Sequence, residues 1–258
     1  MNLPYQLDRS VIIQAPPETV FRFFTDTARW AAWWGTGSTI DPKPGGAVYI
    51  RYPNAIEASG EVIEIEAPRR LVFTFGFNSG KPIAVGGSRV SILLKPDSHG
   101  TLVTLIHDLA EESLRAELVQ GWRYQMSVFS NAVSDEVNAG ASAAVDEWFS
   151  AWAITDASGR LETLRRIAEP DVQFRDRFSL LAGFEDLVVH LGASQRFMPG
   201  IRLERRGEIR HCQGTVLADW AAVTADGTER MAGTNVFLFG PNGKLITVTG
   251  VMNPPPSK

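Results

Sequence analysis

The stretch "SLRAELVQGWRYQMSVFSNAVSDEV", residues 113–137, carries one continuous amphipathic pattern. Its large apolar residues recur at steps of three or four, which is the period of an α-helix. They are Leu118, Trp122, Met126, Phe129, Val133 and Val137. The pattern predicts one long helix with a single buried stripe, and that stripe needs a sheet to cover it.

The sequence before this helix predicts the sheet. Short runs rich in β-branched and aromatic residues occupy 7–15, 46–52, 58–67, 70–77, 87–96 and 100–109, with Gly- and Pro-containing turns between them. Residues 16–34 begin with two prolines and continue with Val20, Phe24 and Thr27 at helical spacing, so we expect a short helix with a second turn there. Short connections favour an antiparallel meander. One long helix cannot touch a strongly curved sheet everywhere, so we expect a cavity between them.

A second pattern starts after the Ala/Gly/Ser stretch "NAGASAA", residues 138–144. We expect helices over 144–155, 159–168 and 183–197, a strand at 171–176, and four further strands at 201–211, 214–225, 228–239 and 244–252. The prediction is therefore an α+β protein of two domains, 1–138 and 143–258.

The composition excludes several classes of protein. The chain of 258 residues has a formal net charge of −4 and no run of Lys or Arg, which argues against nucleic-acid binding. A single cysteine, Cys212, excludes disulfides within the chain, and the four histidines show no metal-binding spacing, so we expect no metal. No stretch has the length of a signal peptide core or a membrane helix, so we expect a soluble, cytoplasmic protein without membrane contact.

The strand "DVQFRD", residues 171–176, places a carboxylate on an apolar face. Side chains alternate along a strand, so Val172, Phe174 and Asp176 share one side. Inside an apolar pocket, desolvation would raise the pKa of Asp176 and make it a usable base. A strand-end acid paired with Arg175 or Arg177 is the alternative.

The second half contains further candidate site residues, which we expect around the same pocket as Asp176. Asn235 alternates inward with Phe237 and Phe239, and a buried amide needs a partner. Trp148, Trp152 and Trp220 are candidate walls, and His190 and His211 are candidate second acid/base groups. Core packing for the indoles and surface positions for the histidines are the alternatives. A Cys212 nucleophile has little support.

The first half supplies its own aromatic candidates. Trp34, Tyr49, Phe75 and Trp122 are candidate walls of its cavity, and His107 is the candidate inward polar group. Simple packing of the helix on the sheet is the alternative for all of them.

The first half resembles the START/Bet v-type helix-grip (SRPBCC) superfamily, in particular its branch similar to the activator of the heat-shock-protein ATPase. The matching stretches lie at 15–35, 58–77, 100–109 and 121–133, together with Gly45 and Gly46. The resemblance implies a hydrophobic cavity under the long helix, and it implies no single chemistry because the superfamily includes binders, cyclases and chaperone-linked proteins.

The second half looks like the SnoaL-like, ketosteroid-isomerase-like cone of the nuclear-transport-factor type, through "RIAEPDVQFRD", "GFEDLVVHL" and residues 218–252. The resemblance implies Asp176 as the proton-shuttling base and Asn235 at the position of the oxyanion-hole acid. Arg177 replaces the usual proline after the base, and Trp152 falls near the usual tyrosine, so steroid isomerisation itself is disfavoured.

Two functions follow from these observations. In the first, the second domain is a cofactor-independent isomerase or cyclase for a small hydrophobic carbonyl compound, with Asp176 as base and Asn235 stabilising the oxyanion. In the second, one or both cavities bind a hydrophobic ligand without catalysis, or the first domain contacts a chaperone-related partner. The second resemblance also implies a homodimer through the C-terminal domain.

Overall fold

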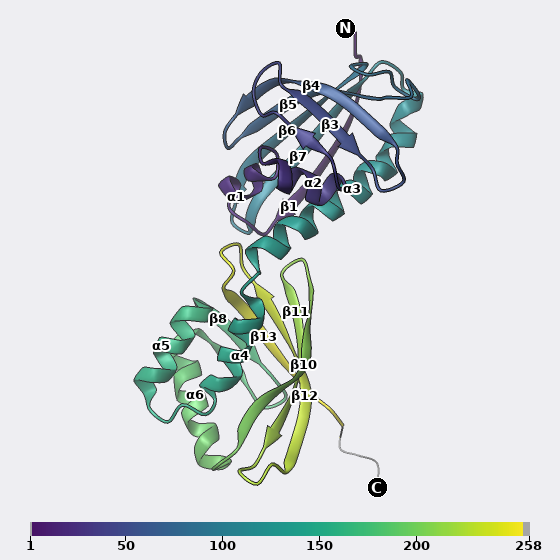
Figure 1. The fold of residues 1–258 in the computed structure, drawn as a ribbon. Helices are drawn as coiled ribbons and strands as arrows, with labels where there is room; N and C mark the ends of the chain where they lie inside the picture. Colours follow the sequence, from purple (N-terminus) through teal and green to yellow (C-terminus); the bar gives the residue numbers. More distant parts are fainter. Residues whose placement is uncertain (1, 255–258) are drawn as a thin grey trace. The chain divides into compact units, whose positions relative to one another are not determined.

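The computed structural model describes residues 2–254 and confirms the predicted α+β class (Figure 1). The chain divides into two compact units, Met1–Glu136 (unit 1) and Val137–Lys258 (unit 2). Each unit has its own sheet and its own core.

Unit 1 is a curved antiparallel sheet with one long helix. Among its described residues the sheet has seven strands in the order β1-β7-β6-β5-β4-β3-β2. The strands are β1 (Tyr5–Ile13), β2 (Thr39–Ile40), β3 (Ala47–Arg51), β4 (Glu57–Glu66), β5 (Arg70–Phe77), β6 (Ser88–Asp97) and β7 (Gly100–Leu109); the helices are α1 (Pro17–Arg22), α2 (Thr27–Trp34) and α3 (Ser113–Val137). Only the two-residue strand β2 was not predicted.

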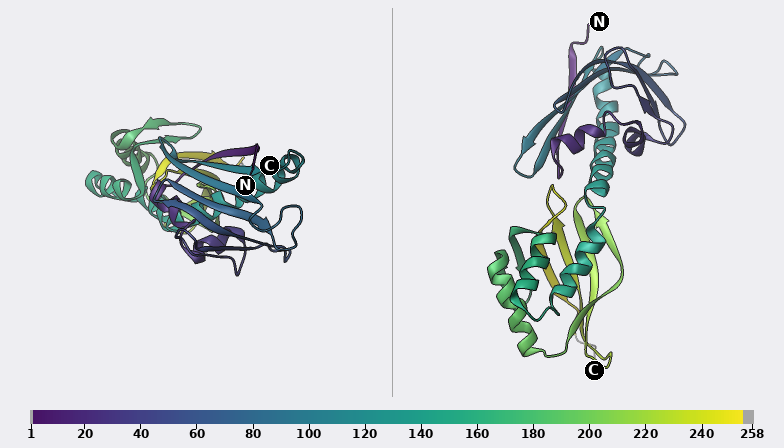
Figure 2. Two further views of the ribbon diagram at one scale, coloured as in Figure 1. Left: turned by 90° about the horizontal axis from the view of Figure 1, so that it is seen from above. Right: turned by 60° about the vertical axis from the view of Figure 1, so that its left-hand side comes forward.

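The predicted stripe of α3 is the centre of unit 1. Trp122, Met126, Phe129 and Val133 are buried, and α3 runs across the hollow of the curved sheet (Figures 1 and 2). The Phe129 ring stacks on Phe24, with 4.9 Å between the ring centroids. Burying side chains of this size supplies about 1.5–3 kcal/mol each, so the stripe is the main attachment of α3 to the sheet.

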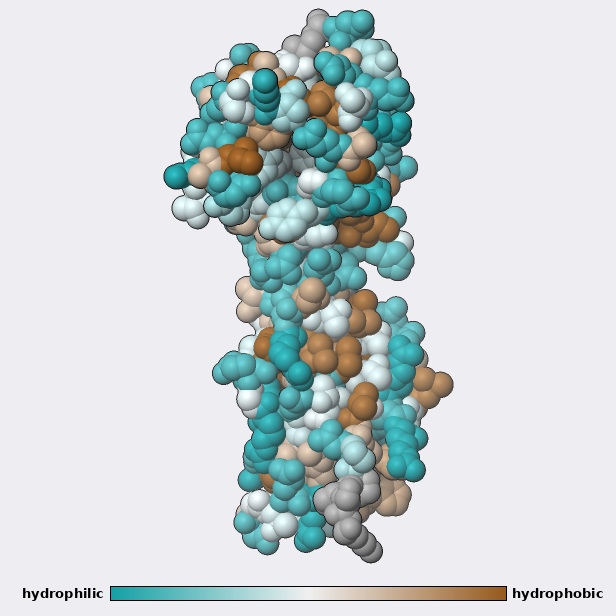
Figure 3. Space-filling model, turned by 90° about the vertical axis from the view of Figure 1, so that its right-hand side faces the viewer, coloured by the Kyte–Doolittle hydropathy of each residue, from teal (hydrophilic) through white to brown (hydrophobic). Residues whose placement is uncertain are grey.

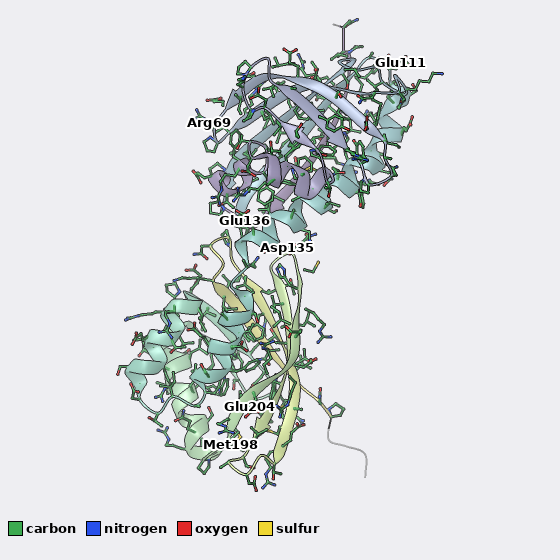
Figure 4. All side chains as sticks on the ribbon, viewed as in Figure 1. Arg69, Glu111, Asp135, Glu136, Met198 and Glu204 are labelled. Atoms are coloured by element: carbon green, nitrogen blue, oxygen red, sulfur yellow. The ribbon has the colours of Figure 1, made fainter. Side chains whose placement is uncertain are left out.

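The C-terminal end of α3 is also held by charge. Glu136, labelled in Figure 4, accepts hydrogen bonds from Arg29 Nε at 2.7 Å and from Arg22 Nη2 at 3.2 Å. Both arginines come from the α1–α2 region, so this carboxylate ties the two short helices to the long one.

A buried polar chain joins α3 to the sheet. Trp122 Nε1–H donates to His107 Nδ1 at 3.0 Å, and His107 Nε2 lies 2.8 Å from Ser88 Oγ. The Ser88 hydroxyl in turn donates to the Phe75 carbonyl at 2.9 Å. Because the indole can only donate, His107 Nδ1 must accept and Nε2 must carry the proton. Every polar group of the chain is satisfied with a neutral imidazole.

Unit 2 packs three helices on one face of a mixed sheet. In its described part the sheet has six strands in the order β10-β11-β12-β13-β8-β9, and only the β13–β8 pair is parallel. The strands are β8 (Ala168–Arg175), β9 (Leu180–Ala182), β10 (Arg202–Cys212), β11 (Thr215–Val223), β12 (Glu229–Phe239) and β13 (Leu245–Met252); the helices are α4 (Ala141–Ala151), α5 (Ala157–Ile167) and α6 (Gly183–Phe197). The short strand β9 was not predicted.

The core of unit 2 lies between the helices and the sheet (Figure 2). It contains Trp148 and Phe149 from α4, Leu187 from α6, and Phe237 and Phe239 from β12, all at most 2% exposed. The opposite face of the sheet carries no helix of the described chain, and Figure 3 looks onto this side of unit 2. Within the described residues, no helix is long and apolar enough to cross a membrane.

The buried His107 makes the stability of unit 1 depend on pH. Burial lowers the pKa of His107 to about 4, while the nearby Asp108 raises it only in part. Below about pH 6.5 the unfolded chain takes up this proton and the folded chain does not, so the free energy of unfolding falls as the pH drops from about 6.5 to 4. The loss should be on the order of 3 kcal/mol.

Urea unfolding of the full chain at several pH values measures this loss. The variant His107→Gln removes the titrating group, so its free energy of unfolding should fall less steeply over the same pH window. Equal pH slopes for wild type and variant would contradict the assignment.

Candidate functional site

The interior of unit 2 contains a cavity of about 190 Å³. Five of the residues predicted from the sequence line it: Trp152, Phe174, Asp176, Trp220 and Asn235. They come from the end of α4, from β8 and the turn after it, and from β11 and β12. The fold therefore brings these five side chains to one space.

Asp176 follows directly after β8. The strand ends at Arg175, and the alternation continues for one more residue, so Asp176 follows the buried Val172 and Phe174 into the cavity wall. A turn holds the acid, because its N–H donates to the Ser179 carbonyl at 3.0 Å. Its Oδ1 accepts from the Phe178 N–H at 2.8 Å, which leaves Oδ2 for a ligand.

Asn235 sits across β13 from this acid. It is 5% exposed and pairs with Gly250 in the β12–β13 ladder. A Cβ added to Gly250 would lie 3.3 Å from both Asn235 Oδ1 and Asp176 Cβ. Gly250 thus leaves open the space between the carboxylate and the amide. Asn235 lines the cavity, so its amide can reach a ligand there.

Two indoles add donors to the cavity wall. The Nε1 atoms of Trp152 and Trp220 are buried and have no hydrogen-bond partner among the described residues. An unpartnered buried donor costs about 1–3 kcal/mol, so a ligand oxygen that reached either N–H would recover that free energy. The wall is apolar apart from these donors, Asn235 and Asp176.

His190 lies behind the wall. Its ring contacts Trp152 and Phe174, with centroids 5.7 and 5.9 Å away, and its Nε2 is 3.4 Å from Ser179 Oγ. Burial lowers the pKa of His190, and the charge of Asp176 opposes this in part. The imidazole is therefore neutral at pH 7, and it supports the turn that carries Asp176.

The other predicted residues of unit 2 do not line the cavity. Trp148 and Phe237 pack against each other in the core, 6.2 Å between centroids. His211 Nε2 accepts from the Gly214 N–H in the β10–β11 turn. Cys212 is exposed.

Several lining residues were not predicted. The side chains that point inward alternate along β12, at Met231 and Asn235, and along β13, at Val248, Gly250 and Met252. This period of two residues is visible in the sequence and could have predicted Met231, Gly250 and Met252 as lining residues. Phe178, Leu203 and Met198 complete the wall. Met198, at the end of α6, and Glu204 of β10 are labelled in Figure 4.

Unit 1 has a larger cavity of about 470 Å³ between α3 and the sheet. Trp34, Phe75 and Trp122, all predicted, line it together with Tyr52 and Gly121. His107 lies behind Trp122, as described above. Tyr49 lies on the other face of β3 from the buried Val48 and Ile50, and its hydroxyl donates to Glu57 Oε1 at 2.7 Å.

Tyr52 is one of the polar residues that line the unit 1 cavity, together with Asn54, Glu117, Tyr124 and Gln125. Burial raises the pKa of the Tyr52 hydroxyl, so the group stays protonated. The cavity thus combines aromatic walls with polar side chains, and the buried Nε1–H of Trp34 in its wall has no hydrogen-bond partner in the described chain. In residues 2–254 no three His, Cys, Asp or Glu side chains gather as metal ligands.

Known proteins are similar to each of the two halves of the chain. Residues 14–134 match the family model described as activator of Hsp90 ATPase homolog 1-like protein, which confirms the resemblance of the first half. No significant match to a curated protein was found.

Solved structures similar to parts of the chain include three that belong to proteins with a stated family or name. A protein of the SnoaL-like family from Agrobacterium tumefaciens, provisionally named an isomerase, is 18% identical and covers 43% of this chain and 96% of its own, with a TM-score of 0.42. CalU16 from Micromonospora echinospora is 27% identical over 51% of this chain and 76% of its own, with a TM-score of 0.40. The Aha1 dimer from Colwellia psychrerythraea is 17% identical over 50% of this chain and 96% of its own, with a TM-score of 0.45. Both predicted resemblances, to activator-type and to SnoaL-like proteins, recur among these matches.

Proposed function

We propose that unit 2 catalyses proton transfer on a small, largely apolar carbonyl compound, as an isomerase or cyclase does. The observation that carries the proposal is the pair Asp176 and Asn235, which flank the open space over Gly250 in an apolar cavity. A carboxylate beside an amide donor matches the needs of enolate chemistry, with no metal or organic cofactor required.

In the proposed reaction Asp176 transfers the proton and Asn235 stabilises the charge that forms on the carbonyl oxygen. Asp176 Oδ2 removes a proton from the carbon next to the carbonyl, and the electron pair moves onto the carbonyl oxygen. Asn235 Nδ2–H, with the N–H of Trp152 or Trp220, stabilises that oxyanion. The protonated Asp176 then returns the proton to another carbon, which shifts the double bond. In a cyclase the enolate carbon would instead attack a second carbonyl, whose oxygen would take the proton.

Exchange of α-protons tests the proposal without knowledge of the natural substrate. Proton NMR in D₂O follows deuterium entry into a two-ring ketone such as 2-tetralone. The wild-type chain should accelerate the exchange over buffer, and Asp176→Asn should lower the acceleration by about 10²–10⁴-fold. Asn235→Leu should lower it by about 10²-fold, because one oxyanion donor is lost.

Asp171→Asn is the matched control for this experiment. Asp171 belongs to the same strand, is exposed, and does not line the cavity, so its variant should keep the wild-type rate. Exchange that is unchanged in Asp176→Asn would rule out this acid as the base.

For unit 1 a second candidate function, binding of an aromatic ligand, rests on Gly121. This glycine lies inside α3 and lines the cavity, yet a Cβ at its position would meet no atom within 4 Å. Glycine inside a helix costs about 1 kcal/mol relative to alanine. Packing does not require glycine here, and its place in the cavity lining makes it a position where a large side chain would block the cavity. A volume of about 470 Å³ also suits a ligand pocket.

Substitutions at Gly121 separate ligand binding from folding. Gly121→Phe should fill the cavity and weaken binding of the neutral probe N-phenyl-1-naphthylamine by at least about tenfold, measured by fluorescence. Gly121→Ala should bind like wild type and be more stable by about 1 kcal/mol. If unit 1 instead only contacts a protein partner, Gly121→Phe will leave probe binding unchanged.

We also propose that two copies pair through the open face of the unit 2 sheet. Leu217 and Val236 lie opposite each other there, on the side away from the buried Asn235 and Phe237. Hydrophobic residues gather on this side between hydrophilic margins (Figure 3). The ion pair of Arg210 with Asp219 lies on this face too, because Asp219 follows Leu217 by two residues along β11.

Charge placed in this face should separate the copies. Val236→Arg should convert a dimer to a monomer in light scattering after size exclusion, because an unpaired charge would be buried. Ile63→Arg, at a 48% exposed position in unit 1, should leave the mass unchanged. A wild-type chain that is monomeric at high concentration would contradict the pairing.

A further inference from the structure

A groove of about 870 Å³ adjoins the unit 2 cavity. Met231, Gly250 and Met252 line both the cavity and the groove. The groove exists because β8 ends at Arg175, paired with Thr249, whereas β13 runs on to Met252. The space that β8 would have occupied therefore stays open beside Gly250.

The cavity is small, so a ligand of ordinary drug size would extend from it into this groove. Pockets that enclose a ligand of drug size have volumes of about 300–1,000 Å³. The cavity, at about 190 Å³, holds only a compact group of one or two rings. The remainder of a larger substrate must lie outside, and the groove that shares Gly250 is the adjoining space.

Two arginines define the chemistry of the groove. Arg177 and Arg230 both line it and both are exposed. Arg230 also lies close enough to Asp226 to help lower the pKa of that carboxyl, which hydrogen bonds from Thr224 and Thr228 lower more strongly. Arg177 also lies at the rim of the cavity, because its guanidinium carbon is 5.8 Å from the centroid of the Phe178 ring, which lines the cavity. The positive charge of Arg177 therefore lies next to the opening of the cavity.

The groove also contains one acid. Glu229 lines it and lies 3.7 Å from Arg206, with which it forms an ion pair. A nearby carboxylate disfavours a doubly charged group such as a phosphate more than it disfavours a singly charged one. A groove lined by two arginines and by one acid that is already paired therefore suits the carboxylate of a ligand.

We infer that the substrate carries a carboxylate, which Arg177 and Arg230 bind in the groove while its apolar, enolisable part occupies the cavity. The inference rests on the proposed function for the identity of the cavity as the reaction site. It names the substrate class as a compact carbonyl compound with an anionic arm. The arginines position the substrate and take no part in the proton transfer.

A matched pair of probes tests the anion site directly. The anion 2-naphthylacetate and the neutral 2-naphthylacetamide have nearly the same shape and differ in charge. Titration of the full chain, labelled with ¹⁵N at tryptophan, follows the indole signals of Trp152 and Trp220 for unit 2 and of Trp34 and Trp122 for unit 1. The anion should bind at unit 2 about tenfold more tightly than the amide at low salt, and this preference should shrink as salt is added.

Charge variants identify the arginines responsible. Arg177→Gln/Arg230→Gln should bring the two affinities to within about twofold, with the amide affinity unchanged. Arg165→Gln/Arg196→Gln removes the same charge from exposed positions of α5 and α6 that do not line the groove, and it should keep the preference. Equal affinities in wild type, no shift of Trp152 or Trp220 with either probe, or a preference that survives the first double variant would each overturn the inference.

The binding experiment is independent of catalysis. If Asp176 is not a base, exchange of 2-tetralone fails while the anion preference persists. If the arginines bind no carboxylate, the preference is absent while exchange of the neutral ketone persists. The two failures are therefore distinguishable.

Discussion

A curved sheet and a straight helix can touch only along part of their length, and both units of this protein are organised around that constraint. In unit 1 the stripe of α3 is buried from Trp122 to Val133, and the contact opens toward the N-terminal end of the helix, where Leu118 and Gly121 line a cavity. In unit 2 the helices cover one face of the sheet, and the uncovered end near Asp176 becomes the second cavity. Twist is intrinsic to sheets of L-amino acids, so these spaces follow from the fold itself.

Both cavities contain buried indole donors without a partner in the described chain; in unit 1 the donor is Trp34 Nε1, whereas the polar groups behind the cavity wall are paired. Behind the wall of unit 1, Trp122, His107 and Ser88 form a closed chain that ends on a backbone carbonyl. Such a network fixes the positions of its side chains, and it leaves no polar group that a ligand would have to satisfy. In unit 2 the indoles of Trp152 and Trp220 have no partner in the described chain. Unpaired donors beside a carboxylate are costly for folding, and the cost is recovered only when a ligand supplies an acceptor.

Much of this arrangement could be predicted from the sequence, because it depends on local periodicity. The limits of α3 and the inward alternation of Phe174, Asp176 and Asn235 follow from periods of 3.6 and 2. The strands β2 and β9 could not be predicted, since two or three residues carry no period. Tyr49 shows a different limit: the alternation of β3 is visible, but which face is buried depends on the other strands.

The groove beside Gly250 was beyond prediction for a related reason. The groove exists because β13 extends beyond the end of its parallel neighbour β8. The register between these two strands sets that difference, and the strands are some 70 residues apart in the sequence. A short-range sequence pattern does not encode such a long-range pairing.

Two glycines connect the folds to their cavities. Gly121 lies within a helix and Gly250 within a strand, where glycine weakens the element by about 0.5–1 kcal/mol relative to alanine. Neither has the left-handed backbone that would demand glycine. At Gly121 a side chain would project into open space, and at Gly250 it would crowd Asn235 and the turn that carries Asp176. At Gly250 the missing side chain weakens the strand and keeps the cavity open, which is the pattern expected where stability is exchanged for room to bind, whereas at Gly121 only a side chain larger than alanine would reach into the cavity.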